Sequence, residues 1–235
     1  MSINHLEFYP IMGEVLNGNN TIWLDMSTNN LSLKEIDLLD TQAFERYVTG
    51  LLAQNNKVFG IGGYLEMRSI YQRSSVFEDS TANKFRNIHL GIDIWSAAGT
   101  AVHCPINGVL HSFQDNKGFG NYGPTVILMH SFQGNNIYSL YGHLSHKDLL
   151  HLKVGQTFEK GEKIGHLGSS PENGNWPSHL HFQLIKNLGR KSGDYPGVCS
   201  STEKEWYQDN CPDPTVWLGL QAENNNRKLH NESYN

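Results

Sequence analysis

Residues 125 to 141 read TVILMHSFQGNNIYSLY and contain two apolar runs separated by a short polar turn. The runs, Thr125–His130 and Ile137–Tyr141, have the length and the β-branched and aromatic content of strands, and Gln133–Asn136 has the composition of a tight turn. The stretch therefore predicts a β-hairpin. Because similar short runs recur on both sides of it, it also favours a mainly β protein over a helical bundle.

Further strands are expected from Phe59 onward. Ala101–Ile106 and Val109–Phe113 flank Asn107-Gly108, a dipeptide that suits the positive φ angles of a type I′ turn, so a second hairpin is expected there. His179–Ile185 is expected to be the last strand. The regular spacing of these runs favours one antiparallel β core.

The segment ahead of these strands has a different pattern. Residues 40–54 predict a helix with Asp40 as its N-cap, because apolar side chains recur at helical spacing. They are Phe44, Tyr47, Val48, Leu51 and Leu52. We therefore expect a helical and irregular N-terminal segment over residues 1–56, a β domain over 57–218 and a polar tail over 219–235.

Composition limits the classes of function. The 235 residues with 38% hydrophobic content are enough for one substantial domain, and the net charge of -5 argues against a nucleic-acid binder. No stretch approaches the ~18 apolar residues that span a bilayer. The N-terminus lacks the basic and apolar pattern of a signal peptide, so the chain as given is expected in the cytoplasm, or in the cell envelope if another route exports it. Nothing in the sequence indicates an oligomeric state.

Cysteine spacing gives no sign of a thiolate site. Cys104, Cys199 and Cys211 form no Cys-x-x-Cys pair, so neither a disulfide framework nor a cysteine zinc site is expected. A bridge between Cys199 and Cys211 remains an alternative for an exported protein.

Four histidines and one aspartate in three separate segments carry the chemistry: His89, Asp93, His143, His179 and His181. Imidazole nitrogens and carboxylate oxygens are ordinary zinc ligands, and a catalytic zinc needs three of them plus an open position. Taken alone, the polar residues of each segment could equally be ordinary surface or strand-end residues that bind no metal. Their combination at expected strand ends favours a hydrolase.

The spacing within these segments makes two geometric demands. His179 and His181 leave the same face of a strand, since side chains alternate. His89 and Asp93 would lie ~13 Å apart on a regular strand, too far to share one ion, so the chain must bend between them. Gly91 lies at the midpoint and allows the φ angles of a bulge or turn.

Other catalytic motifs are absent from the sequence. It contains no His-Glu-x-x-His, no Gly-x-Ser-x-Gly and no phosphate-binding loop, so histidine is the expected proton carrier. Among the remaining histidines, which are expected to be structural or solvated, one of His103, His111 and His130 can line the cleft.

Three motifs in order, His-x-Gly-x-Asp from His89, Gly-His-Leu-Ser around His143 and His-Leu-His-Phe from His179, resemble the lysostaphin and LytM type of zinc metallopeptidases. The resemblance covers roughly residues 59–185. It implies an antiparallel β core of that type and Zn²⁺ as the cofactor, with His89, Asp93 and His181 as ligands. It also implies that His143 and His179 are the catalytic histidines and that the substrates are peptide bonds of bacterial peptidoglycan.

The function expected is therefore a zinc-dependent metalloendopeptidase that cleaves peptide bonds in peptidoglycan cross-links or related peptides, through a zinc-activated water and two catalytic histidines. Two alternatives remain. One is a non-catalytic metal-binding or regulatory module of the same fold. The other is a lipoyl- or biotin-type carrier, suggested by Val154-Gly155-Gln156 and Lys160-Gly161, although the Met-Lys-Met of a carrier is absent.

Two regions depart from the resemblance or extend it. The approach to His89, from Tyr64–Arg68 to Lys84–Arg86, is longer than usual in such peptidases. In the resembling family, segments ahead of the catalytic domain can cover the groove and supply a ligand. Simple packing of residues 1–56 against the β domain is expected here, with a covering side chain from Asn17, Asn19 or Asn20 as the alternative.

Overall fold

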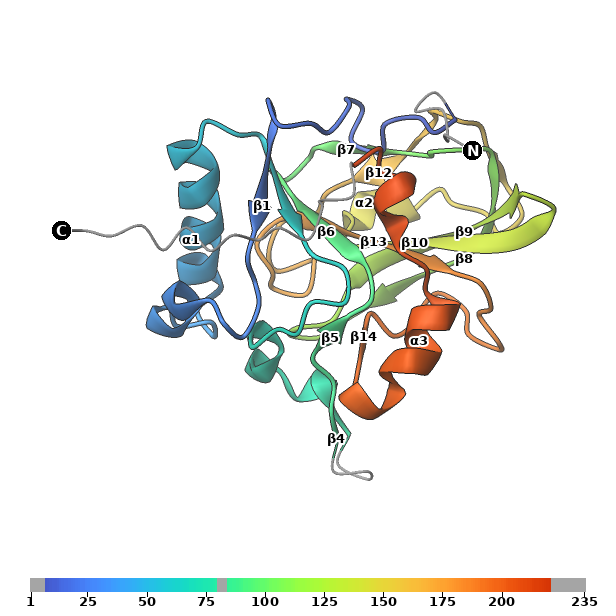
Figure 1. Ribbon diagram of the computed structural model, residues 1–235. Coiled ribbons are helices and arrows are strands. Elements are labelled where there is room, and N and C mark those ends of the chain that lie inside the picture. Colours follow the sequence, from blue (N-terminus) through green and yellow to red (C-terminus); the bar gives the residue numbers. More distant parts are fainter. Residues whose placement is uncertain (1–6, 80–83, 221–235) are drawn as a thin grey trace.

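The centre of the fold is an eight-stranded sheet (Figure 1). The computed structural model describes residues 7–79 and 84–220. The mainly β fold expected from the sequence is confirmed. In spatial order the strands are β1 (Thr21–Leu24), β2 (Phe59–Gly62), β6 (Ile92–Trp95), β13 (His179–Ile185), β10 (Asn135–Gly142), β9 (Gly123–Phe132), β8 (Gly108–Asn116) and β11 (Thr157–Phe158).

Smaller elements surround this sheet. Two-stranded pairs are formed by β3 (Glu78–Asp79) with β4 (Lys84–Phe85), β5 (Ile88–His89) with β14 (Val198–Cys199), and β7 (Ala101–His103) with β12 (Lys163–His166). The α-helices are α1 (Thr41–Gln54), α2 (His146–Leu149) and α3 (Lys204–Asn210). Short 3-10 helices cover η1 (Leu31–Glu35), η2 (Ile70–Arg73), η3 (Ser75–Phe77), η4 (Ser201–Glu203) and η5 (Pro214–Val216).

The hairpin predicted at residues 125–141 is present as β9 and β10. The strands close on a two-residue loop, with Phe132 opposite Asn135. Gln133 and Gly134 both have positive φ angles, 51° and 78°, as a type I′ turn requires. The pairings within the large sheet are antiparallel, as expected, except that β1 runs parallel to β2 at one edge.

The second predicted hairpin, around Asn107-Gly108, is wrong. β7 pairs with β12, and β8 pairs with β9 and β11, so the two runs join different sheets. Neither Asn107 nor Gly108 has a positive φ angle, so no type I′ turn forms. After β7 the chain does not turn back toward β8. Instead, the Cys104 amide donates to the Glu162 carbonyl, and the Gly161 amide donates to the Cys104 carbonyl, so long-range pairing overrides the local turn preference.

The predicted N-terminal helix is confirmed as α1. Asp40 caps it, since its Oδ1 accepts a hydrogen bond of 2.9 Å from the Gln42 amide. The predicted apolar face packs inward, with Phe44, Val48 and Leu52 buried. The helix stands beside β1 at one end of the sheet (Figure 1). Its Phe44 and Val48 therefore join a second hydrophobic cluster, separate from the main core, which also contains Tyr71, Trp95 and Trp176.

The N-terminal segment is built into the sheet rather than laid over it. Residues 21–24 form β1 and pair with Phe59–Gly62 in register. Between residues 7 and 56, ten apolar side chains are buried. They are Phe8, Ile11, Met12, Leu16, Leu24, Met26, Leu33, Phe44, Val48 and Leu52.

A chain that begins at Asn56 is therefore expected to be unstable. Burial of one large apolar side chain contributes about 1.5–3 kcal/mol, so loss of ten exceeds the ~5–15 kcal/mol that holds a typical domain together. Urea denaturation followed by circular dichroism measures this. A truncated chain that unfolds at the same urea concentration as the full chain would show that the segment is dispensable.

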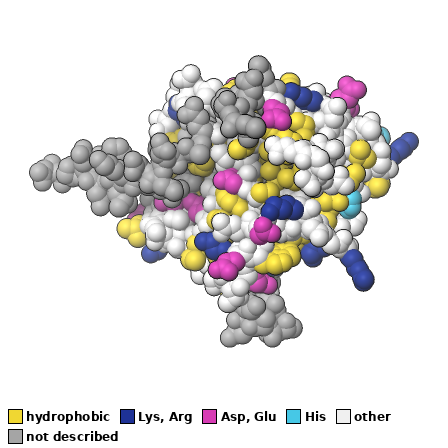
Figure 2. All heavy atoms as spheres, turned by 45° about the vertical axis from the view of Figure 1, so that its right-hand side comes forward, with side chains coloured by type: hydrophobic (Ala, Val, Ile, Leu, Met, Phe, Trp, Pro, Cys, Tyr) yellow, Lys and Arg dark blue, Asp and Glu magenta, His cyan; other side chains and the backbone are white. Residues whose placement is uncertain are grey.

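The described residues include no helix that is both long and apolar enough to cross a membrane. On the face shown in Figure 2, Lys and Arg side chains lie among Asp and Glu side chains.

Cys104, Cys199 and Cys211 are buried free thiols, and burial raises the pKa of Cys104 and Cys211 to about 12. The tail predicted over residues 219–235 begins too early, because Leu220 is buried in the main core, and residues 221–235 lie outside the described residues.

Candidate metal centre

Side-chain alternation along two central strands places three of the site residues. The even-numbered residues 92 and 94 of β6 and 180 to 184 of β13 belong to the main core. The odd-numbered Asp93, His179 and His181 therefore leave the opposite face of the sheet. Asp93 and His181 are directly opposite each other in the β6–β13 pairing, so their side chains meet.

His89 reaches this face from β5, outside the large sheet. The chain bends between β5 and β6, as the sequence requires, but the reason differs from the one predicted. The φ angle of Gly91 lies outside the left-handed region. A Cβ atom at Gly91 would lie 2.6 Å from the Phe182 carbonyl oxygen and 2.9 Å from the His181 ring. Glycine is needed here for close approach to β13 rather than for an unusual backbone angle.

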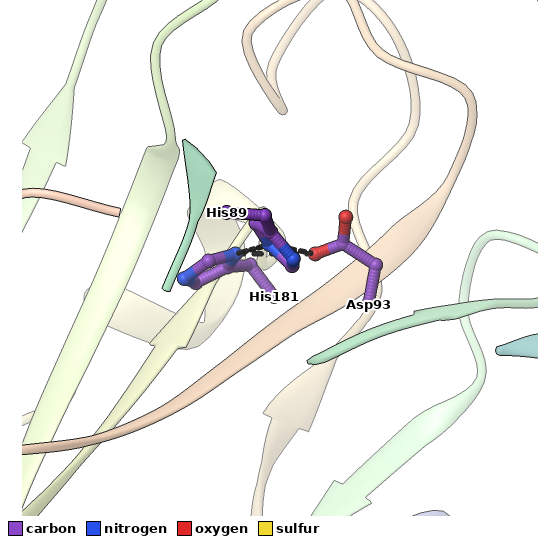
Figure 3. Close-up of side chains that lie close together, drawn as sticks. All are labelled: His89, Asp93 and His181. Atoms are coloured by element: carbon purple, nitrogen blue, oxygen red, sulfur yellow. Dashed lines mark hydrogen bonds and ion pairs between the residues drawn. The ribbon is translucent and has the colours of Figure 1, made fainter. Parts of the chain in front are cut away.

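The three side chains converge on one point (Figure 3). His89 Nε2 lies 2.9 Å from His181 Nδ1 and 3.2 Å from Asp93 Oδ1, and His181 Nδ1 lies 3.1 Å from the same oxygen. All three residues are buried. Tetrahedral zinc with bonds of ~2.0–2.1 Å keeps its ligand atoms ~3.3 Å apart, so the set has nearly the spacing that such an ion requires.

Hydrogen bonds behind the rings fix which nitrogen faces the cluster. His89 donates from Nδ1 to the Gly63 carbonyl at 3.0 Å, and His181 donates from Nε2 to Gln183 Oε1 at 2.9 Å. Gln183 is held in this orientation because its amide nitrogen donates to Pro196 O and Cys211 Sγ. The nitrogens that face the cluster therefore carry lone pairs.

Two lone pairs and a carboxylate oxygen repel one another unless a cation lies between them. Burial lowers the pKa of His89 to about 4, with nearby Arg68 acting in the same direction, so this ring is neutral at neutral pH. Burial alone would raise the pKa of Asp93, but His89 and Arg68 outweigh it and hold that pKa well below its usual range. The donor set, two imidazoles and one carboxylate, fits zinc.

His143 and His179 lie beside this cluster with a common orientation. His143 donates from Nδ1 to the Asn173 carbonyl at 2.8 Å, and His179 donates from Nδ1 to the Pro177 carbonyl at 2.7 Å. Their rings lie 4.1 Å apart, centroid to centroid. Burial lowers the pKa of both, well below the ordinary value for His143. Each ring is therefore neutral, with Nε2 left as a proton acceptor.

The backbone of His143 is strained. Its φ angle is 64°, in the left-handed region that only glycine adopts without cost. This conformation follows Gly142 at the end of β10, and the His143 amide donates to the Tyr122 carbonyl. Strain of this kind costs ~1–3 kcal/mol and is typical of residues whose direction matters for function.

A cavity of about 220 Å³ opens onto these groups. Asp93, His143, His179 and His181 line one side of it. Aromatic residues of α1, the η2 and η3 turns and the loop before β13 line much of the rest: Phe44, Tyr71, Phe77 and Trp176. Apolar walls keep bulk water away from the polar groups, which strengthens their electrostatic interactions.

The N-terminal segment contributes to the cavity wall, but Asn17, Asn19 and Asn20 do not cover the cavity. Asn17 and Asn20 bond within the loop from Glu14 to Thr21, and Asn19 donates to Asn17. None of these three residues lines the cavity. The expectation that the segment packs against the β domain is the one the structure follows, with Phe44 of α1 at the cavity.

The histidines that the sequence predicts to be structural or solvated lie outside the cavity. His130 bonds Asn107 O and Ser139 Oγ, and His103 packs on Tyr9. Neither these two nor His111 lines the cavity. Two of the remaining histidines pair with aspartates near the surface, His146 with Asp115 and His166 with Asp148.

Sequence reasoning missed four residues that shape the site: Arg68, Tyr122, Trp176 and Gln183. Tyr122 places its hydroxyl 3.4 Å from His181 Nε2, and Trp176 packs edge-on against His143 and His179. Gln183 has a visible signal, since it lies two positions after His181 on the same strand face. Arg68 and Tyr122 have none, because only the folded chain brings their segments to the cluster, whereas Trp176 lies three residues before His179.

Gly91→Ala is expected to lower zinc affinity by ~10- to 100-fold, the range seen when the support of a metal ligand is disturbed. The new methyl group meets the Phe182 carbonyl, and that backbone cannot move without moving His181. Competition with a chromophoric zinc chelator measures the affinity. Gly50→Ala is the control, because a Cβ there has no neighbour within 4 Å and α1 gains about 1 kcal/mol of helix propensity. Equal zinc affinity in both variants would show that the contact at Gly91 does not matter.

Comparisons with known proteins find similar sequences and structures. Residues 87–192 match the model of Peptidase family M23. The chain is similar to the L-Ala--D-Glu endopeptidase of Bacillus subtilis (strain 168), with 28% identity over 155 residues, covering 60% of this chain and 45% of that enzyme. The match therefore spans less than half the length of this relative.

Solved structures of related domains are also similar. The catalytic domain of the prophage-encoded M23 protein EnpA from Enterococcus faecalis has 25% identity and a TM-score of 0.36, over 45% of this chain and 73% of that one. The catalytic domain of lysostaphin from Staphylococcus simulans has 24% identity and a TM-score of 0.37, over 52% and 80%. The matched family segment holds the three clustered residues and both neighbouring histidines. Residues 87–192 thus resemble a domain of peptidase family M23.

Proposed function

We propose that the chain is a zinc-dependent metalloendopeptidase that hydrolyses peptide bonds in peptidoglycan cross-links or related peptides. In this proposal His89, Asp93 and His181 hold the metal. One observation carries the proposal: three buried ligand atoms converge within 2.9–3.2 Å, and two of their residues, Asp93 and His181, line a cavity. Such an arrangement is costly without a cation and is what an open zinc site requires.

A zinc ion bound there would supply Lewis acidity, which lowers the pKa of water and polarises a carbonyl. The chain itself supplies the support for the ligands. The Gly63 carbonyl and the Gln183 amide oxygen hold the two imidazoles in the tautomers that offer lone pairs. Fixed tautomers keep the ligand directions constant, which favours a single geometry of the site.

His143 and His179 are proposed to move the protons. Each has Nδ1 tied to a backbone carbonyl, so only Nε2 can exchange a proton with water or substrate. A neutral imidazole accepts the proton of the attacking water at Nε2. An imidazole that has gained a proton donates from Nε2 to the developing oxyanion and then to the leaving amine. The short distance between the two rings lets them share these tasks.

The cavity also bears on the substrate class. Its lining includes Arg86, Lys191 and Asp194 as well as aromatic side chains, so it can contact both charged and apolar parts of a peptide. The similar enzyme from Bacillus subtilis is an L-Ala--D-Glu endopeptidase. From this likeness we propose cell-wall peptides as the substrates.

Digestion of purified peptidoglycan tests the proposal. The zinc-loaded chain is expected to release fragments whose masses correspond to hydrolysis of one type of peptide bond, and a chelator is expected to stop the release. His179→Ala serves as the inactive control. A folded, zinc-loaded chain that cleaves neither peptidoglycan nor its isolated peptides would instead support the non-catalytic metal-binding module.

A further inference from the structure

Arg68 is a fully buried cation behind the candidate metal ligands, with 1% of its surface exposed. Its Nη1 donates to Asp93 Oδ2 at 2.5 Å and contacts the Tyr71 hydroxyl at 3.3 Å. Its Nε donates to Glu66 Oε2 at 2.8 Å. Its Nη2 lies 3.4 Å from the Gly63 carbonyl oxygen, the same oxygen that accepts from His89 Nδ1.

These contacts divide the two oxygens of Asp93 between two tasks. Oδ1 faces the two imidazoles, and Oδ2 is held by the Arg68 guanidinium. Held in this way, the carboxylate turns one oxygen toward the imidazoles while the other is occupied by Arg68. Arg68 also contacts the carbonyl that orients His89, so one guanidinium restrains two of the three clustered side chains.

Glu66 resolves the electrostatic difficulty of this arrangement. A buried guanidinium close to a divalent cation repels it, and a lone Arg68–Asp93 pair would have no net charge to attract it. Glu66 adds a second carboxyl group next to Arg68, so the group of Glu66, Arg68 and Asp93 holds two acidic side chains against one basic side chain. Glu66 is itself fixed, because its Oε1 accepts from the Met26 amide at 3.3 Å, in the N-terminal segment.

We propose that Arg68, fixed by Glu66, is a positioning residue that limits Asp93 to a single ligand oxygen and sets the direction of that oxygen. The inference rests on the proposed metal centre. The competing explanation is a buried ion-pair network that serves only packing, since such networks also occur without any functional role. The two explanations differ in what happens to the metal when Arg68 is changed.

The experiment uses the full chain with Arg68→Met and Arg68→Lys. Each purified variant is titrated with zinc against a competing chelator, and a second sample is loaded with cobalt(II) for visible spectroscopy. The variants are expected to lose ~10- to 100-fold in zinc affinity. The visible absorption of cobalt(II) is expected to weaken, because a released Asp93 can bind through both oxygens and raise the coordination number.

Arg73→Met is the matched control. Arg73 is also a buried arginine, 6% exposed, but it stacks on Phe119 and Trp176 and donates to Thr41 rather than to the clustered side chains. This variant is expected to lose stability while its zinc affinity and cobalt spectrum stay as in the wild type. Equal zinc affinity and an unchanged cobalt spectrum in folded Arg68→Met and Arg68→Lys would overturn the proposal.

Glu66→Gln decides the question if neither Arg68 variant folds. The amide keeps the shape of the side chain but removes the charge that offsets Arg68, so zinc affinity is expected to fall, and an unchanged affinity overturns the proposal. Failure of the metal centre itself gives a different result. In that case the wild-type chain binds neither zinc nor cobalt(II), whereas failure of the Arg68 role alone leaves wild-type binding intact.

Discussion

Replacement of His181 by alanine is expected to remove bound zinc and to reduce peptide hydrolysis to background. The same result is expected for His89→Ala and Asp93→Ala. Each change removes one of three protein donors, which costs more than the ~10- to 100-fold lost when only an outer hydrogen-bond partner of a ligand is changed. Elemental analysis of the purified chains, expected to show about one zinc per chain for the wild type, measures the loss.

His130→Ala is the control for these three variants. His130 is equally buried and makes two hydrogen bonds, to Asn107 O and Ser139 Oγ, but it lies away from the cavity. It is expected to lose stability and to keep its zinc. Full zinc retention by all three cluster variants would show that the metal, if one binds, is held elsewhere.

The second large effect is expected at the two histidines beside the cluster. His143→Ala and His179→Ala should keep zinc and fold but lose at least ~100-fold in kcat, because each removes a group that carries protons or stabilises the oxyanion. Steady-state kinetics on a soluble cell-wall peptide, together with zinc analysis, separates this effect from metal loss. Loss of zinc from either variant would mean that the histidine is a ligand instead.

The strained backbone at His143 requires one precaution. Alanine does not favour a φ angle of 64°, so part of any stability loss in His143→Ala comes from the backbone. His143→Asn avoids this, since asparagine adopts the left-handed region more readily. Equal loss of kcat in the Ala and Asn variants would assign the effect to the imidazole.

The parts of the fold that the sequence predicts are those determined by neighbouring residues. The β9–β10 hairpin follows from two apolar runs and a loop that accepts positive φ angles, and α1 follows from its cap and apolar face. β13 begins and ends where the sequence predicts. The Asn107-Gly108 hairpin fails because β7 and β8 find better partners far along the chain, and no local rule contains that competition.

The candidate site shows the same division between local and long-range information. Histidine spacing on β13 and the need for a bend at Gly91 are readable in the sequence, although the bend serves close approach to Phe182 rather than an unusual φ angle. Arg68 is not readable, because it meets Asp93 across 25 residues and its segment has no regular period. A buried charge can be assigned a role only when its partners are known.

The order of the cluster along the chain has a consequence for synthesis. His89 and His181 are separated by 92 residues, and Asp93 and His181 by 88. The final donor belongs to a central strand, so the donor set does not exist until β13 has joined β6 and β10. In such distant pairings the entropy of closing the loop is lost before the stabilising contacts form, which makes these pairings late steps in folding. Any activity that depends on the cluster is therefore latent in a growing chain and arises only with the assembled sheet.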